Sequence, residues 1–228
     1  MTSAAVERDD DAADPLTGPT IGEMYARIEA YYSAKLARHG AIPLGVDWSC
    51  TATQWLRFVQ LLKVCAFDSP FSLIDLGCGY GALAAFLAET HPGASIDYLG
   101  IDLSPAMIQR ARRRHRGKPA TRFAVGRSCP READYIVTSG TMNVKLGYPL
   151  GLWESFVRAI LLDMRRMSKR GFAVNFMMSP TPGAPPGQLY CCDPATLVRF
   201  CQDELDCSVE ILRDYGLKEF TVLGRCTP

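Results

Sequence analysis

The chain has 228 residues, a length that favours one domain with a full hydrophobic core. Its net charge of +1 provides no global field for nucleic acid or an anionic membrane, so we expect neither as a partner. The nine cysteines stand at irregular spacings without paired CxxC units, which predicts no metal site and favours reduced thiols. The sequence shows no signal peptide and no proline-free apolar span, so it predicts a cytoplasmic protein.

The N-terminal part precedes the first predicted strand and is expected to be an addition to a core fold. Residues 1–20 are rich in Asp, Pro and Gly and are predicted to form a disordered acidic tail. Apolar residues at helical spacing predict one helix over 21–39, which Gly40 ends, and another over about 51–65. Residues 21–68 are therefore predicted to be a helical cap.

Strands and helices alternate from residue 71 onward, which predicts a mostly parallel sheet. The last two predicted strands are joined so briefly, at residues 214–216, that they must form an antiparallel hairpin. We thus expect a doubly wound α/β domain over residues 69–228, with seven strands. The predicted strands are 71–75, 96–101, 122–125, 135–138, 172–178, 208–212 and 219–224, and the predicted helices include 151–167 and 194–206.

A glycine-rich turn follows the first predicted strand, where the hydrophobic period changes from strand to helix. Its glycines permit positive φ and leave bare backbone next to the N–H groups of the new helix. Asp102 ends the second strand, 21 residues after Gly81, at the sheet edge where ligands of such folds bind. A carboxylate there can accept hydrogen bonds from both hydroxyls of a ribose. Ser104 already provides the N-cap of the next helix, so the sequence predicts a ribose-bearing cofactor.

The identity of that cofactor depends on Asp75. Residues 77–82 also satisfy the GxGxxA form of the dinucleotide fingerprint, which keeps an NAD(P)-dependent oxidoreductase as an alternative. A carboxylate at Asp75, directly before the glycines, would repel a pyrophosphate. It suits a cofactor with a cationic amino acid end and a sulfonium, and the C-terminal hairpin in place of a sixth βα unit favours the same choice.

Two stretches carry a resemblance to a known family. IDLGCGYG at residues 74–81 and GIDLSPAMI at residues 100–108 resemble motif I and its successor in class I S-adenosylmethionine (SAM)-dependent methyltransferases. The resemblance covers about residues 71–178 and the terminal hairpin. It implies a Rossmann-like fold, SAM as cofactor and methyl transfer to a small molecule, with a non-catalytic SAM-binding protein as a further alternative. TSGTMNVKL at residues 138–146 also resembles bacterial methyltransferase-like proteins, without indicating a substrate.

The resemblance also implies the cofactor contacts. Asp75 would hold the amino group, the glycine turn would wrap the methionine portion, and Asp102 would hold the ribose. The acidic residue that many relatives place after the third strand is missing, so Ser128 or a backbone group would contact the adenine. The implied cofactor residues are Asp75, Gly77, Cys78, Gly79, Asp102, Leu103, Met107, Ser128, Ser139 and Gly140.

Methyl transfer is an in-line displacement, for which the protein aligns the two reactants and excludes water. A base is needed only where the acceptor loses a proton. Asn143, beyond the fourth strand, and His39, at the end of the first helix, are the predicted catalytic candidates, and for His39 the favoured alternative is a structural role at the helix end. The predicted substrate-side residues are Tyr32, Trp48, Arg57, Lys145, Asn175 and Tyr190. The Pro-rich loop before Tyr190 is a candidate lid, and the basic run 110–118 is a predicted solvated face.

Overall fold

One sheet organises the computed structural model, which describes residues 19–178 and 188–226. Its main path has the order β3-β2-β1-β4-β5-β8-β7, and the short β6 pairs with β5 beside that path. The strands are β1 (Phe71–Leu76), β2 (Ile96–Asp102), β3 (Thr121–Val125), β4 (Ala133–Thr138), β5 (Ser168–Met178), β6 (Cys191–Cys192), β7 (Cys207–Leu212) and β8 (Glu219–Cys226).

The directions of the strands confirm the predicted doubly wound topology. Strands β1 to β5 pair in parallel, whereas β8 runs antiparallel to both β5 and β7. The seven predicted strands form the main path, and β6 was not predicted because two residues carry no period. Strand β5 begins four residues before the predicted position, because Ser168 already pairs with Ala133 despite the charged residues that follow it.

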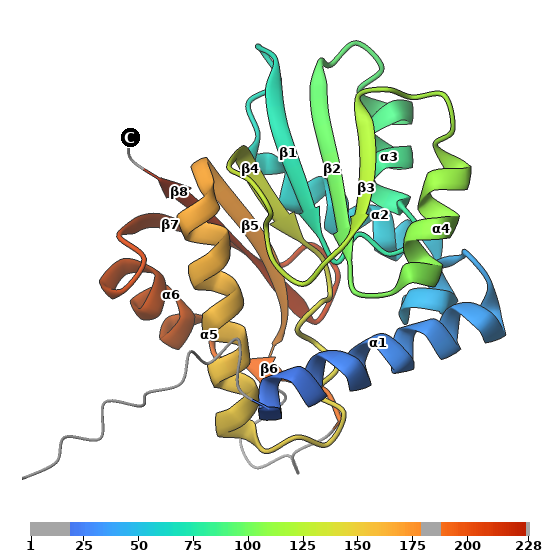
Figure 1. Cartoon of the computed structure of the whole chain (residues 1–228). Helices are drawn as coiled ribbons and strands as arrows, with labels where there is room; N and C mark the ends of the chain where they lie inside the picture. The colour runs from blue at the N-terminus through green and yellow to red at the C-terminus, as the bar shows by residue number, and fades with distance from the viewer. Residues whose placement is uncertain (1–18, 179–187, 227–228) are drawn as a thin grey trace, which may run out of the picture.

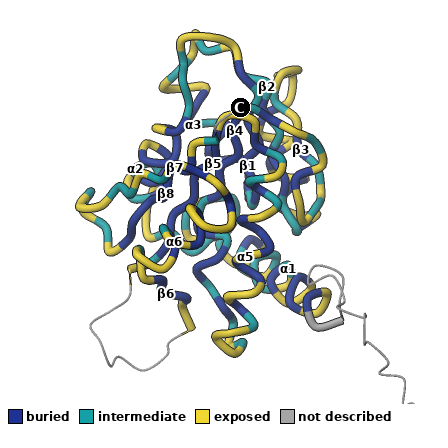
Figure 2. Tube along the Cα trace, turned by 90° about the vertical axis from the view of Figure 1, so that its left-hand side faces the viewer, coloured by how far each residue is buried: buried dark blue, intermediate teal, exposed yellow. Residues whose placement is uncertain are grey.

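Helices cover both faces of the sheet (Figure 1). Helices α5 and α6 lie on one face, while α2, α3 and α4 lie on the other. Alternate strand residues explain the two layers, because Ile74 and Ile136 join one apolar cluster and Leu73 and Val137 join the other. The helices are α1 (Pro19–His39), α2 (Thr51–Leu61), α3 (Ala82–Thr90), α4 (Pro105–Arg114), α5 (Leu150–Met167) and α6 (Pro194–Asp203), with short 3-10 segments η1 (Pro43–Val46) and η2 (Leu62–Val64). Figure 2 shows the central strands as mostly buried.

Helix α1 runs across the end of the sheet where the parallel strands finish, at the bottom of Figure 1. Its first half adds Met24 and Ile28 to the cluster under α5, and its second half adds Leu36 to the cluster under α3. The side chains of Ser33 and Ser104 lie 2.7 Å apart through their Oγ atoms, which ties α1 to the start of α4. The helix therefore joins both layers and covers the carboxyl edge of the sheet.

Two sequence predictions concern segments at the limits of the described residues. Helix α1 begins at Pro19, so the last two residues of the predicted tail are helical, and residues 1–18 lie outside the described part. Most of the candidate lid, residues 179–187, also lies outside it. Within the described ranges, we find no helix with a stretch apolar and long enough to cross a membrane.

Candidate functional site

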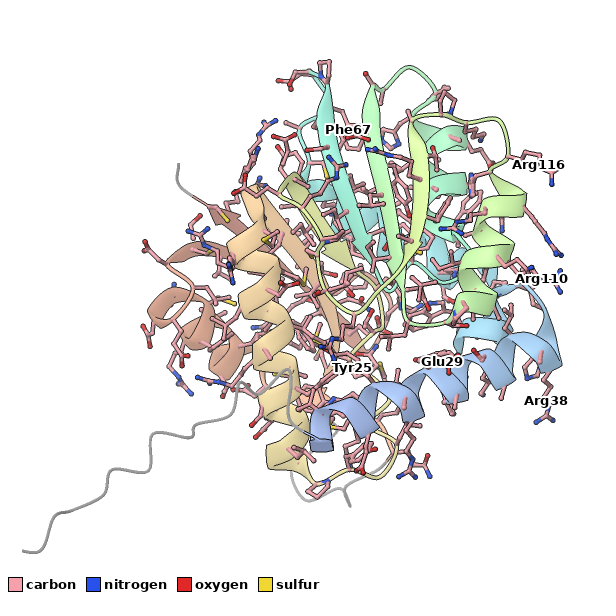
Figure 3. All side chains as sticks on the ribbon, viewed as in Figure 1. Tyr25, Glu29, Arg38, Phe67, Arg110 and Arg116 are labelled. Carbon is pink, nitrogen blue, oxygen red and sulfur yellow. The ribbon has the colours of Figure 1, made fainter. Side chains whose placement is uncertain are left out.

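A cavity of about 310 Å³ lies between the carboxyl ends of the strands and α1. Figure 3 shows Tyr25 and Glu29 on the side of α1 that faces the strand ends, and Phe67 at the opposite end of the sheet. The cavity brings together most of the predicted site residues. Those that line it are Tyr32, Trp48, Arg57, Asp75, Gly77, Cys78, Gly79, Asp102, Leu103, Met107, Ser139, Gly140 and Asn143.

The glycine turn forms one wall of the cavity. The backbone N–H groups of Gly77 and Cys78 both donate to the carbonyl of Ile101, at 2.7 and 2.9 Å. Gly77 has φ 77° and Gly79 has φ 54°, in the left-handed region that favours glycine. A Cβ on Gly77 would also overlap the Oγ1 atom of Thr141. The turn is thus fixed against β2, and its backbone faces the cavity without side chains in between.

His115 supports this turn from behind, a role that the sequence did not indicate. Its Nε2 atom lies 2.9 Å from the carbonyl oxygen of Gly81, and its ring lies 5.3 Å from the ring of Phe123. Arg110 and Arg116 project outward from the same segment, as the predicted solvated face requires (Figure 3). The prediction was therefore wrong for His115, which is buried because it follows the end of α4 and turns inward.

Asp102 is held in place by backbone donors. Its Oδ2 atom accepts from the N–H of Gly79 at 2.8 Å, and its Oδ1 atom accepts from the N–H of Ser104 at 2.9 Å. Ser104 itself caps α4 by accepting from the N–H of Met107. Burial raises the pKa of Asp102 to about 6, although the two backbone donors oppose the shift. Each carboxylate oxygen can accept more than one hydrogen bond, so the carboxylate is oriented and still able to bind a diol.

Asp75 lies deeper, at the end of β1, with only 3% of its surface exposed. The hydroxyl of Tyr98 donates to its Oδ2 atom at 2.5 Å. Burial raises the pKa of Asp75 to about 7, while the Tyr98 hydrogen bond lowers it and Asp102 raises it further. A cation placed in the cavity would favour the charged form of this carboxyl group.

The opposite wall is a chain of contacts from Trp48 to the backbone of Gly140. The guanidinium of Arg57 lies 3.8 Å from the ring centroid of Trp48 and makes two hydrogen bonds to Glu219, the Nε bond at 2.8 Å. The side-chain amide of Asn175 donates to Glu219 at 2.9 Å and accepts from the N–H of Gly140 at 3.0 Å. This network contacts the wall at the Trp48 ring and at the backbone N–H of Gly140, and it holds both in place.

Asn143 lines the cavity and has a buried side-chain amide without a hydrogen-bond partner among the described residues. Only 4% of its surface is exposed, and neither its amide nitrogen nor its amide oxygen has a hydrogen-bond partner among the described residues. Its backbone is fixed, because its N–H donates to Gly140 and its carbonyl accepts from the N–H of Tyr190 at 2.7 Å. The Oγ atom of Ser139 is also buried without a partner. Because unpaired buried polar groups are costly, the Asn143 amide and the Ser139 hydroxyl are candidates for hydrogen bonds to a ligand.

Five predicted site residues do not line the cavity: His39, Ser128, Lys145, Asn175 and Tyr190. His39 is the last residue of α1, so the geometry gives no support to a catalytic role for it. Ser128 is exposed, and Gly126 and Arg127 take the place after β3, where the sequence allowed a backbone group as the alternative.

The other residues outside the cavity have structural partners. The Nζ atom of Lys145 donates to the carbonyl of Tyr148 at 3.2 Å. The ring of Tyr190 lies edge-on to Phe176, with 6.2 Å between the ring centroids. Asn175 lies behind the cavity wall and acts on it through its hydrogen bonds. The prediction of direct substrate contact is thus unsupported for all three.

Sequence reasoning missed several lining residues. Glu219 is the clearest case, although a charged residue at the start of the apolar strand β8 was a usable signal. Gln54, Glu29 and Arg127 also line the cavity, and nothing in their local sequence marked them. The described residues contain no group of three or more His, Cys, Asp or Glu side chains that could hold a metal ion.

Comparisons with known proteins agree with this geometry. A family model described as a methyltransferase domain matches residues 73–171. A Mycobacterium tuberculosis protein named as a methyltransferase, Rv1506c, is 41% identical over 165 residues, which cover 72% of this chain and 98% of that protein. A trans-aconitate 2-methyltransferase of Methylobacterium nodulans is 38% identical over 76 residues, or 30% of this chain and 28% of that protein.

Solved structures share the fold. Magnesium protoporphyrin IX methyltransferase of Synechocystis PCC 6803, with bound S-adenosylhomocysteine (SAH), superposes with a TM-score of 0.54 at 16% identity, over 93% of this chain and 97% of that one. Human N-acetylserotonin methyltransferase in complex with SAM superposes with a TM-score of 0.59 at 18% identity, over 93% of this chain and 62% of that one. Together with the extensive identity to Rv1506c, these observations show that the chain belongs to the class I SAM-dependent methyltransferase family.

Proposed function

We propose that the two halves of this cavity hold SAM and a small-molecule acceptor side by side. The single observation that carries the proposal is the buried, unpartnered amide of Asn143 in the same cavity as Asp75, Asp102 and the glycine turn. Family membership favours this function over the two alternatives that the sequence left open, an NAD(P)-dependent oxidoreductase and a non-catalytic SAM-binding protein.

The residues on the β1 and β2 side fit the proposed cofactor. Asp102 would accept hydrogen bonds from the ribose hydroxyls, and Asp75 would pair with the amino group. The backbone of Gly77 would lie against the methionine portion, and a side chain at this position would overlap Thr141. Leu103 and Met107 line the cavity beside Asp102 and would flank the adenine.

Charge supports the same assignment: the described lining holds five acidic side chains and two arginines, and the pairing of Asp47 with Lys35 and of Glu219 with Arg57 leaves three carboxyl groups without an ion-pair partner in the described part of the chain. An excess of carboxylates favours a cofactor that carries a sulfonium and an ammonium group. The acidic residues are Glu29, Asp47, Asp75, Asp102 and Glu219, and the arginines are Arg57 and Arg127.

For methyl transfer, the protein mainly needs to align the two reactants and to exclude water. Bound SAM would supply a sulfonium methyl group, to whose carbon the acceptor atom would bond in line as the carbon–sulfur bond breaks and SAH leaves. Helix α1 would exclude water from the carboxyl edge, and Asn143 would orient the acceptor by hydrogen bonding. The buried network behind Trp48 and Gly140 would hold the acceptor wall rigid. A cytoplasmic location and the absence of nucleic acid or membrane partners stay predictions.

The test combines binding with turnover. We expect SAM and SAH to raise the melting temperature of the full chain, and NAD to leave it unchanged. With SAM and the small-molecule fraction of a bacterial extract, we expect SAH to form, and we expect Asn143→Ala to slow its formation while keeping the thermal shift with SAH. Stabilisation by NAD alone would overturn the cofactor assignment, and SAM binding without SAH formation from any fraction would favour the non-catalytic alternative.

A further inference from the structure

Among the described residues that line the cavity, none carries an unpaired positive charge near Asn143. Two cations belong to the described lining, Arg57 and Arg127. Arg127 follows β3, and its guanidinium lies 5.6 Å from the ring centroid of Tyr25 on α1, which is the side of the proposed adenine site. Residues 179–187, outside the described part, contain no Lys, Arg, Asp or Glu. The charge of the acceptor wall therefore rests on Arg57.

Arg57 is already neutralised. Its side chain is 8% exposed and that of Glu219 is 2% exposed, and the guanidinium gives two of its donors to the Glu219 carboxylate. A further donor goes to the carbonyl of Thr53 at 2.7 Å. A buried ion pair of this kind presents no net charge, and separating it would leave a buried charge uncompensated. An incoming carboxylate would lose its hydration and gain no cation in return.

Asn143 favours an acceptor that can both donate and accept hydrogen bonds. Its side chain offers both N–H donors and a carbonyl acceptor, and neither function is satisfied by the described residues. A carboxylate can only accept hydrogen bonds, so it would leave the Asn143 oxygen unpaired. A group that presents a donor beside an acceptor, such as a carboxamide or a hydroxyl next to a carbonyl, would satisfy both atoms. The Oγ atom of Ser139, which can donate or accept, adds a further partner.

We propose that the wall formed by Trp48, Asn143 and the Arg57–Glu219 pair selects an uncharged acceptor with a hydrogen-bond donor beside an acceptor, and rejects carboxylates. The inference rests on the proposed function, because it assigns the acceptor half of the same cavity. It separates this chain from the trans-aconitate 2-methyltransferases to which parts of it are similar, since aconitate is a tricarboxylate. Glu219 is thus a specificity-determining residue, which cancels the charge of Arg57.

The test uses matched pairs of a carboxamide and a carboxylate of equal shape: benzamide with benzoate, and indole-3-carboxamide with indole-3-carboxylate. Their dissociation constants are measured by ligand-observed NMR against the full chain saturated with SAH. We expect each carboxamide to bind about tenfold or more tightly than its carboxylate, the effect of one satisfied hydrogen bond. Equal or tighter binding of the carboxylates, or no binding of either carboxamide, would overturn the inference.

Variants assign the preference to residues. Asn143→Ala should reduce the preference for carboxamides, and Gln202→Ala, which removes an exposed amide on α6, should leave it unchanged. Glu219→Gln should raise the affinity for carboxylates because Arg57 becomes unpaired. If Glu219→Gln does not fold, the carboxamide and carboxylate affinities of the wild-type protein and of Asn143→Ala still test the inference. Failure of SAH itself to bind would refute the proposed function, whereas normal SAH binding with a preference for carboxylates would refute this inference alone.

Discussion

Replacing Asp102 with alanine removes the carboxylate that we assign to the cofactor ribose. That carboxylate is oriented by the N–H groups of Gly79 and Ser104 at 2.8 and 2.9 Å, so it binds a diol without a cost of ordering. Two hydrogen bonds to a charged acceptor contribute about 1.5 kcal/mol each, or about 3 kcal/mol together. The dissociation constant of SAH should therefore rise about 100-fold in Asp102→Ala, measured by isothermal titration calorimetry.

The matched control is Asp97→Ala, in the same strand. Asp97 lies outside the cavity lining and pairs with Arg122 and Arg131 at the surface, so its loss should leave SAH affinity unchanged. Thermal melts of both variants without ligand would separate a binding loss from unfolding. A change of less than about twofold in the SAH affinity of a folded Asp102→Ala would refute the ribose assignment.

Three further predictions concern Asn143, Asp75 and Gly140. Asn143→Ala should lower kcat about tenfold or more while the SAH dissociation constant stays within about twofold, and a comparable loss of SAH affinity would instead place Asn143 in the cofactor site. SAH affinity should rise with pH up to about 7, because only the ionised form of Asp75 pairs with an ammonium and its pKa is raised to about 7. Calorimetry at several pH values should show a weaker rise in affinity for Asp75→Asn. An identical rise in the variant would exclude this role of Asp75. Because the folded state binds the Asp75 proton more tightly than the unfolded state does, the contribution of Asp75 to the stability of the unliganded protein should fall as pH rises from about 4 to 7, a loss that Asp75→Asn should not show. Gly140→Ala should lower the free energy of unfolding in urea more than Gly147→Ala does, since both glycines have positive φ but only at Gly140 would a Cβ overlap the Trp48 ring; equal losses would contradict the proposed packing.

The residues of the proposed cofactor half could be placed in one cavity from the sequence because their signals are local. Asp75 and the glycines stand in one strand-turn-helix segment, and Asp102 ends the next strand, so parallel topology alone brings them to one edge of the sheet. The same rule placed Asn143, which follows β4. These predictions needed the direction of the strands and no knowledge of side-chain packing.

The acceptor wall could be predicted only in part, because its contacts join distant segments. Arg57 and Glu219 are 162 residues apart, and no periodicity links α2 to the first residue of β8. The sequence predicts Asn175 as a substrate contact, but its side chain forms hydrogen bonds with Glu219 and Gly140 instead. Ser128 was named by its position after β3, where the backbone presents Gly126 to the cavity and leaves the serine exposed.

The most direct test of the account is a crystal structure of the protein with SAH. We expect the ribose hydroxyls within hydrogen-bond distance of Asp102 and the amino group beside Asp75. The sulfur should face an open space bounded by Asn143 and Trp48, where the acceptor would bind. Binding of SAH outside this cavity would contradict the division of the site into a cofactor half and an acceptor half. Hydrogen bonds between SAH and the side-chain amide of Asn143 would contradict it as well.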